Sequence, residues 1–250
     1  MLGNFKFGGV SVQGQSHQAT STPCQDANLC YHDEILSLLA VADGLGSCLY
    51  SDIAAEIAVN AAKEYCQKSR FISIKKLFHY CRGKILRYAK AHKLDPEQMH
   101  TTLLVLVAID DRLLAGQIGD GAVVFNYGEQ FTRIFQQQLV QKRGPVNVTS
   151  TLLQKDYHLD VLYLEEVLTD QLQSIFLMTD GVTPVSTSYQ DESAYQPFFE
   201  YLLKKILLPT FDDEILIKRA ENLLMSEQFS MHSKDDKTLA FAINNTINEI

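Results

Sequence analysis

An apolar run ends in Asp-Gly in the stretch Leu38-Leu39-Ala40-Val41-Ala42-Asp43-Gly44. The same pattern recurs in Ala115-Gly116-Gln117-Ile118-Gly119-Asp120-Gly121 and in Ile175-Phe176-Leu177-Met178-Thr179-Asp180-Gly181. A single Asp-Gly pair is typical of a hairpin turn. Three pairs, each at the end of a mostly apolar run of strand length, indicate instead that buried strands hold three carboxylates at one edge of a sheet.

The segments around these runs predict further strands and four helices. Strands are expected at Phe5–Val12, Ala27–Tyr31, Ile35–Ala42, Thr102–Ile109, Leu113–Ile118, Ala122–Tyr127, Phe131–Phe135, Val161–Leu164, Ile175–Met178 and Thr238–Ile243. Helices are expected through Ile53–Tyr65 and Leu77–Tyr88, and near Ala194–Leu207 and Asp213–Met225. Ser47 or Ser51 is the expected cap of the first helix.

Short turns join several of the strands, at Asp110-Asp111 and at Asn126–Gln130, and this favours antiparallel pairing. The polar stretch Gln136–Asp160 is expected to form a long loop or flap. Two helix pairs separate groups of strands, so each pair can cover one sheet. The sequence therefore predicts an α+β fold, a four-layer α/β/β/α sandwich of two mainly antiparallel sheets flanked by helix pairs. We expect a single domain over residues 1–250.

The composition excludes several classes of protein. The chain has 250 residues, a net charge of −8 and 46% hydrophobic residues, which is typical of a globular domain. The acidic balance argues against a nucleic acid or an anionic membrane as the main partner. No signal peptide or membrane-length apolar run is visible, so a cytoplasmic location is expected. Five cysteines without a Cys-x-x-Cys pair predict reduced thiols.

Further acids stand directly before predicted strands. Asp26 precedes the strand at Ala27–Tyr31, and Asp235 and Asp236 precede the last strand. Carboxylates gathered at one sheet edge repel one another, and a hard divalent cation is the expected compensation. Because all of these candidate ligands are oxygen atoms, the pattern favours Mg²⁺ or Mn²⁺ over Zn²⁺.

This ordered set of motifs resembles the metal-dependent protein phosphatase family of the 2C type. The matching pieces span most of the chain: Gln25-Asp26-Ala27, Asp43-Gly44-Leu45-Gly46, Thr101-Thr102, Gly119-Asp120-Gly121, Thr179-Asp180-Gly181 and Asp235-Asp236-Lys237-Thr238. The opening, with Ser16-His17 and Pro23-Cys24, is similar to a compact bacterial branch of that family. The resemblance implies the same four-layer sandwich, with the metal site between its two sheets.

The resemblance also implies a ligand set for two metal ions and a weaker third one. Asp43 would bridge two ions, the Gly44 carbonyl would bind the first, and Asp180 and Asp235 would complete the second. Asp120 would help to form the third site beside Asp180.

The implied activity is serine/threonine phosphoprotein phosphatase, in which a metal-bridged water hydrolyses a phosphate monoester. Asp26 would orient that water. The implied substrates are phosphorylated proteins that are targets of a kinase. This implies a role in signalling.

The chain departs from the family pattern in places that matter for catalysis. Ser21 stands where many members have an arginine that clamps the phosphate, and Leu45 stands where some have a histidine proposed as general acid. His17 is a candidate substitute as phosphate partner, and a surface or structural role is the alternative. The usual Asp-Asn of the last motif is Asp235-Asp236, and we expect Asp235 to be the ligand.

These departures leave a second class of function open. In one alternative the chain is a catalytically weak or inactive phosphatase-like module that binds phosphoprotein. In another it is a metal-dependent hydrolase of small phosphate esters. The retained carboxylates argue against an inactive module, because acids packed together without a metal are destabilising.

Overall fold

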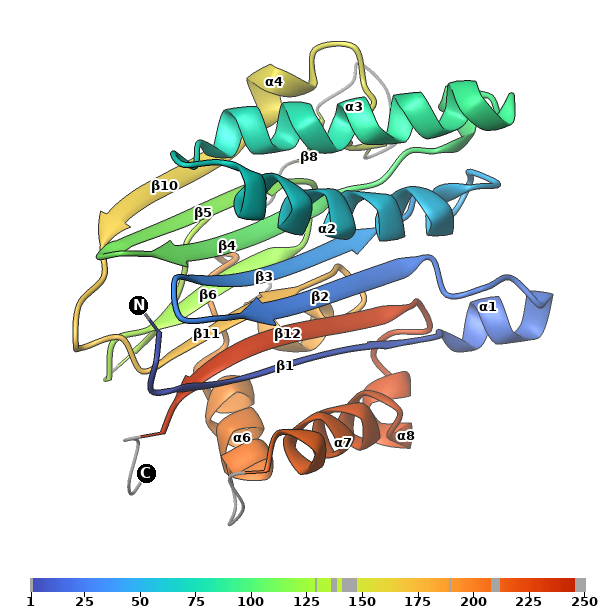
Figure 1. The fold of residues 1–250 in the computed structure, drawn as a ribbon. Coiled ribbons are helices and arrows are strands. Elements are labelled where there is room, and N and C mark those ends of the chain that lie inside the picture. The colour runs from blue at the N-terminus through green and yellow to red at the C-terminus, as the bar shows by residue number, and fades with distance from the viewer. Residues whose placement is uncertain are drawn as a thin grey trace.

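Two antiparallel sheets pack face to face with helices on both outer sides, which confirms the predicted four-layer sandwich (Figure 1). The structure is a computed structural model and describes residues 2–128, 130–135, 139–140, 148–188, 190–207 and 212–245. No helix within these described ranges is long and apolar enough to cross a membrane.

Each large sheet has five strands. The first sheet has the order β10 (Leu162–Val167), β5 (Arg112–Ile118), β4 (Leu103–Ile109), β3 (Leu36–Asp43) and β2 (Asp26–His32). The second has the order β1 (Phe5–Val12), β12 (Lys237–Asn244), β11 (Ser174–Met178), β6 (Ala122–Asn126) and β7 (Phe131–Arg133). A separate two-stranded sheet pairs β8 (Leu139–Val140) with β9 (Val148–Thr149).

Two long helices cover the first sheet and two others cover the second (Figure 1). They are α2 (Ser51–Lys68) and α3 (Ile74–His92) on one side, and α6 (Gln196–Leu207) and α7 (Asp213–Leu224) on the other. The remaining helices are short: α1 (Gln15–Thr20), the 3₁₀ helix η1 (Pro96–Gln98), α4 (Tyr157–Asp160), α5 (Thr183–Ser186) and α8 (Glu227–Ser230).

The continuous apolar runs arise because the central strands are buried on both faces. In β3, Leu39 and Val41 point into the core between the sheets, whereas Leu38 and Ala40 pack beneath α2 and α3. Side chains alternate across a strand, so Asp43 falls on the same face as Leu39 and Val41. The last residue of this strand therefore presents its carboxylate to the space between the two sheets.

Two local predictions need correction. The residue that caps α2 is Tyr50, which makes no side-chain cap hydrogen bond. Ser51 is the first helical residue, and its hydroxyl donates to the Cys48 carbonyl instead, so the prediction of Ser47 or Ser51 as the cap is wrong. The predicted loop Gln136–Asp160 contains β8, β9 and α4, while its residues 136–138 and 141–147 lie outside the described ranges.

The predicted turns are confirmed by the strand registers. Ile109 pairs with Arg112 across the turn, and Asp110 there has a left-handed backbone with φ 54°. Asn126 pairs with Phe131 across the second turn, of which residue 129 lies outside the described ranges.

Candidate active site

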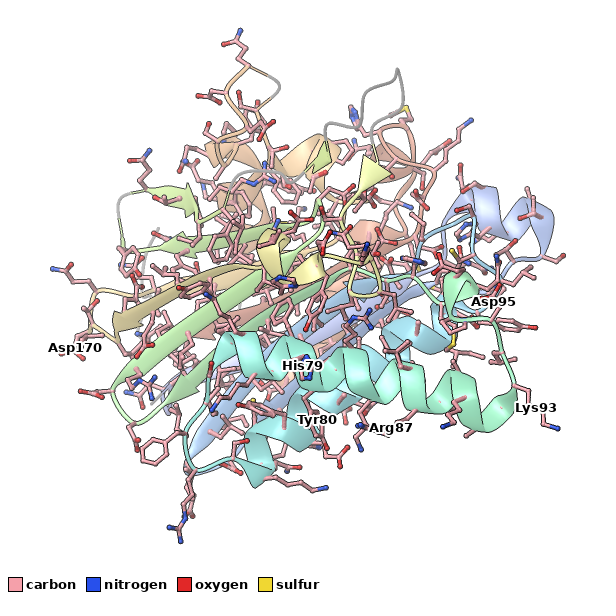
Figure 2. The ribbon with its side chains drawn as sticks, turned by 90° about the horizontal axis from the view of Figure 1, so that it is seen from above. His79, Tyr80, Arg87, Lys93, Asp95 and Asp170 are labelled. Carbon is pink, nitrogen blue, oxygen red and sulfur yellow. The ribbon has the colours of Figure 1, made fainter. Side chains whose placement is uncertain are left out.

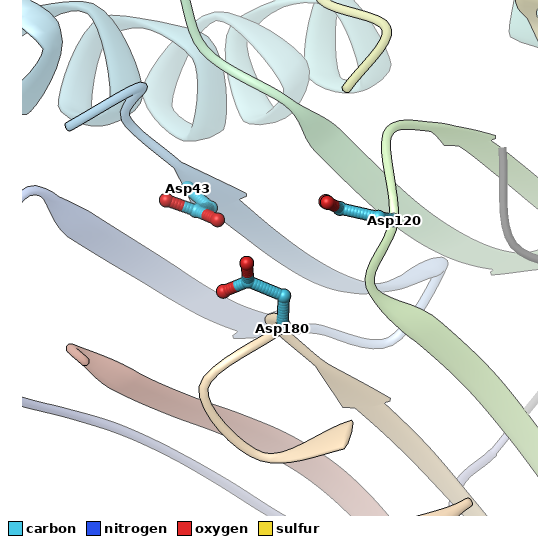
Figure 3. A group of neighbouring side chains, drawn as sticks. All are labelled: Asp43, Asp120 and Asp180. Carbon is cyan, nitrogen blue, oxygen red and sulfur yellow. The ribbon is translucent and has the colours of Figure 1, made fainter. Parts of the chain in front are cut away.

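Three predicted acids meet where the two large sheets come together. Asp43 ends β3, Asp120 lies between β5 and β6, and Asp180 follows β11. One carboxylate oxygen from each residue lies within 4.8 Å of the others (Figure 3). The prediction that one edge of a single sheet holds all three is wrong, because β3 and β5 belong to one sheet and β11 to the other. Only the sandwich of two sheets brings the three carboxylates together.

The glycines that follow Asp120 and Asp180 are required because a side chain at either position would collide with neighbouring backbone. A Cβ on Gly181 would lie 1.8 Å from the Asp236 carbonyl oxygen, and one on Gly121 would lie 2.4 Å from the Met178 carbonyl oxygen. Neither glycine has a left-handed backbone. Only glycine therefore lets these loops approach one another closely enough to gather the carboxylates.

A threonine pair fixes the backbone of Asp43. The Asp43 N–H donates to the Thr102 hydroxyl over 2.9 Å, and its carbonyl accepts from the Thr101 hydroxyl at 3.0 Å and from the Thr102 N–H at 2.8 Å. The sequence identifies the pair as a motif without showing this role. The hydrogen bonds hold the end of β3, and with it the Asp43 carboxylate, in one position.

Replacing Thr102 by valine is expected to destabilise the protein by about 1–3 kcal/mol, because the Asp43 N–H loses its buried acceptor. Thr102→Ser keeps the acceptor and is the matched control. Thermal unfolding of both variants measures the difference. An equal melting temperature for Thr102→Val and Thr102→Ser would show that the hydroxyl does not hold Asp43.

Asp26 lies next to Asp43, because these residues are paired in the β2–β3 register. Its Oδ2 accepts a hydrogen bond from the Thr179 hydroxyl at 2.7 Å. Burial raises the pKa of Asp26 to about 8, and the Thr179 and Thr238 hydroxyls partly oppose that shift. Asp26 stands close to the cluster but is not among the side chains that line the cavity described below.

Burial and mutual repulsion raise the pKa of every acid in the cluster. For Asp43 burial is the largest cause, followed by the charges of Asp26, Asp180 and Asp120. Burial is also the main reason that the pKa of Asp180 rises to about 7, and that of Asp120 rises as well. The Arg133 guanidinium partly opposes the rise in the pKa of Asp120, but among the described residues no Lys or Arg forms an ion pair with Asp43, Asp120 or Asp180. A hard divalent cation would supply the missing positive charge, so this donor set fits the predicted Mg²⁺ or Mn²⁺.

The two adjacent acids of the last motif have different environments. Asp235 borders the cavity, and its charge helps to raise the pKa of Asp180. Asp236 is buried and accepts from the Gly14 N–H at 2.7 Å and the Gln25 N–H at 2.6 Å. The placement of Asp235 is therefore compatible with a ligand role, and that of Asp236 with a structural one.

A cavity of about 550 Å³ opens over the cluster. Its lining includes Asp43, Gly44, Asp180 and Asp235, and a set of hydroxyl side chains contributed by Ser16, Thr20, Thr22, Thr102, Thr149 and Thr151. No Lys or Arg is found among the described residues of this lining. Thr20, Thr22, Thr149 and Thr151 are additions to the predicted site, and they come from short polar segments that give no periodic signal.

His17 also lines the cavity. Its Nδ1 lies 2.8 Å from Asp236 Oδ2, so the buried carboxylate fixes the ring. Ser21, at the family's arginine position, is exposed, has a left-handed backbone with φ 56° and is absent from the lining. The Ser21 side chain is therefore not part of the described lining, although its neighbours Thr20 and Thr22 are, and His17 on α1 borders the cavity.

Comparisons with known proteins agree with this geometry. Residues 13–215 match the family model described as protein phosphatase 2C. The chain is 28% identical to serine/threonine-protein phosphatase 3 of Escherichia coli (strain K12), over 94% of this chain and 96% of that protein.

Solved structures show the same fold. A bacterial serine phosphatase superposes with a TM-score of 0.68 at 15% identity, covering 98% of this chain and 99% of the other. The catalytic domain of the serine/threonine protein phosphatase PstP, solved with two manganese ions, gives a TM-score of 0.65 at 18% identity, over 96% and 97% of the two chains. The family match over most of the sequence and the meeting of Asp43, Asp120 and Asp180 lead to one conclusion: this chain belongs to the protein phosphatase 2C family.

Proposed function

We propose that the protein is a metal-dependent serine/threonine phosphoprotein phosphatase that hydrolyses phosphate monoesters. The observation that carries this proposal is the approach of the Asp43, Asp120 and Asp180 carboxylates to within 4.8 Å beside an open cavity. Family membership and the named activity of the relative support it.

The groups that would hold Mg²⁺ or Mn²⁺ are the Asp43, Asp120, Asp180 and Asp235 carboxylates and the Gly44 carbonyl. Two ions and a weaker third are expected. When bound, these ions supply Lewis-acid activation of water and neutralise charge on the phosphoryl oxygens.

Hydrogen bonds within the chain orient the Asp43 and Asp26 carboxylates. The threonine pair holds Asp43, and the hydroxyl of Thr179 holds Asp26 beside it. We assign to Asp26 the orientation of the attacking water, because its carboxylate is fixed next to the cluster. Leu45 lines the cavity where some family members have a histidine, so a proton for the leaving group has to come from water.

His17 is assigned to the substrate phosphate. A contact between His17 and the phosphate is similar in the ground state and the transition state. His17→Ala should therefore raise KM about tenfold and change kcat less. Gln18→Ala, an exposed neighbour on α1 outside the lining, is the matched control. Steady-state kinetics on p-nitrophenyl phosphate measure both constants. A KM that is unchanged in His17→Ala would remove His17 from the binding site.

Comparison of substrates tests the proposed function. With Mn²⁺ present, we expect phosphate release from phosphothreonine and phosphoserine peptides at a kcat/KM well above that for nucleotides. Faster hydrolysis of nucleotides than of any peptide would instead support a hydrolase of small phosphate esters. Peptide binding without release would support an inactive module, which none of the comparisons favours.

Several wider statements stay predictions from the sequence. They are one catalytic domain over residues 1–250, a cytoplasmic location, substrates that are the targets of a kinase, and no nucleic acid or membrane as partner. The core that the two sheets share is compatible with one domain.

A further inference from the structure

The outer face of α3 carries an unusual concentration of positive charge. The helix contains six of the chain's 22 Lys and Arg residues, two histidines, and no Asp or Glu. The chain as a whole has a net charge of −8, so its remainder is more acidic still. A patch of this kind on an acidic protein gives the surface a strongly polarised field.

The cations of α3 differ in their contacts and in their exposure. Lys84 pairs with Glu64 on α2, Arg82 lies over the Tyr157 ring, and the exposed Lys75 lies over the Tyr163 ring. The other exposed cations are Lys76, Arg87, Lys90 and, just after the helix, Lys93, which we call the basic ridge; of these, Arg87 also lies over the Tyr80 ring. None of these four forms an ion pair with a carboxylate among the described residues.

The C-terminal end of the basic ridge lies on the same side of the molecule as the end of β3, which carries Asp43 (Figure 1). Figure 2 shows His79, Tyr80 and Arg87 along α3 and Lys93 and Asp95 at its C-terminal end. The chain after α3 is joined to the cavity lining, because the Leu45 N–H donates to the His100 carbonyl over 3.0 Å.

We propose that the basic ridge on α3 is a docking surface for an acidic segment of the phosphoprotein substrate, outside the phosphorylated residue itself. This inference rests on the proposed function. The cavity offers hydroxyls and His17 but no Lys or Arg among its described lining residues, so a positively charged contact with a substrate protein has to lie outside the cavity. A helix of 19 residues is about 28 Å long, which an extended segment of about eight residues would span.

The helix suits a polypeptide better than a lipid surface. A helix that lies on a membrane inserts its apolar face into the lipid. The apolar face of α3, with Leu77, Phe78 and Ile85, is buried against the protein. Apart from the exposed Phe71 and Tyr163 near the start of α3, the ridge presents charge, which complements a segment rich in Asp and Glu side chains.

The test uses a charge reversal on the ridge and an equal reversal elsewhere. Arg87→Glu/Lys90→Glu changes two exposed ridge positions. Lys204→Glu/Lys205→Glu changes two exposed residues of α6, on the opposite helical layer, and is the matched control. The substrates are a phosphothreonine peptide with an Asp/Glu extension, the same peptide with a Gly/Ser extension, and p-nitrophenyl phosphate.

In wild type and the α6 control, kcat/KM at low salt should be about fivefold to tenfold higher for the peptide with the Asp/Glu extension than for the one with the Gly/Ser extension. The ridge variant should lose that difference. Activity on p-nitrophenyl phosphate should be the same in all three proteins. Equal preference in wild type and the ridge variant would overturn the proposal. Loss of p-nitrophenyl phosphate activity in the ridge variant alone would also overturn it.

A binding assay separates this inference from the proposed function. Fluorescence anisotropy of the unphosphorylated Asp/Glu peptide needs no turnover, and its affinity should fall about fivefold in the ridge variant. An inactive wild type that still binds this peptide through the ridge would contradict the phosphatase and keep the docking surface. Ridge-dependent binding of anionic vesicles or duplex DNA, with unchanged affinity for the peptide, would assign the ridge to another partner and overturn the proposal.

Discussion

Asp43→Asn is expected to reduce turnover at least about a thousandfold, because we propose that the Asp43 carboxylate is a ligand of both metal ions, which supply the activation of water. The same variant should be as stable as the wild type or more stable when metal is absent. Burial and three neighbouring carboxylates oppose the ionised form of Asp43, and the amide removes that repulsion. Loss of activity together with a retained or raised melting temperature separates a ligand from a residue that only supports the fold.

Asp170→Asn is a suitable control for this experiment. Asp170 is exposed and lies at the other end of the molecule from the end of α3 (Figure 2). Its variant should keep wild-type turnover and metal-free stability. Near-normal turnover of a folded Asp43→Asn protein would show that catalysis occurs elsewhere.

The metal-free protein is expected to lose stability as the pH rises from about 5 to about 8. In the unfolded chain the aspartates ionise near their usual pKa of about 4, whereas in the folded chain the pKa values are about 8 for Asp26 and about 7 for Asp180. The folded state therefore holds more protons within this window, and its stability is greatest at the acidic end. We expect a decrease of at least about 2 kcal/mol between pH 5 and pH 8.

Added metal should reverse this trend, because the ionised carboxylates that destabilise the metal-free fold are the form that binds Mn²⁺. Urea unfolding at several pH values, with a chelator or with Mn²⁺, measures both effects. Metal-free stability that rises between pH 5 and pH 8 would contradict the clustered arrangement of the acids.

The fold was predictable because its strands and long helices carry strong periodic signals. Runs such as that in β3 are apolar at every position because both faces are buried, and α2 and α3 repeat their apolar residues at helical spacing. The short helix α1 escaped prediction because it has no buried residue and hence no apolar period. The cap of α2 was mispredicted because the Ser51 hydroxyl bonds to the Cys48 carbonyl instead of a helix N–H.

The composition of the site was predictable and its supporting contacts were not. Three Asp-Gly pairs after apolar strands pointed to Asp43, Asp120 and Asp180, and the structure brings their carboxylates together. The hydrogen bond between His17 and Asp236 joins residues 219 positions apart, so no local pattern reveals it. The space that Gly181 leaves for the Asp236 carbonyl is equally a property of the packed loops.

Phosphate release from a phosphothreonine peptide, measured as Mn²⁺ is added back to metal-stripped protein, tests whether the acidic cluster is the metal site of a phosphatase. We expect no release without metal, and recovery of turnover as at least two ions bind at the site formed by Asp43, Gly44, Asp180 and Asp235. Turnover that is undiminished after exhaustive chelation, or a stripped protein that binds no Mn²⁺, would contradict this expectation.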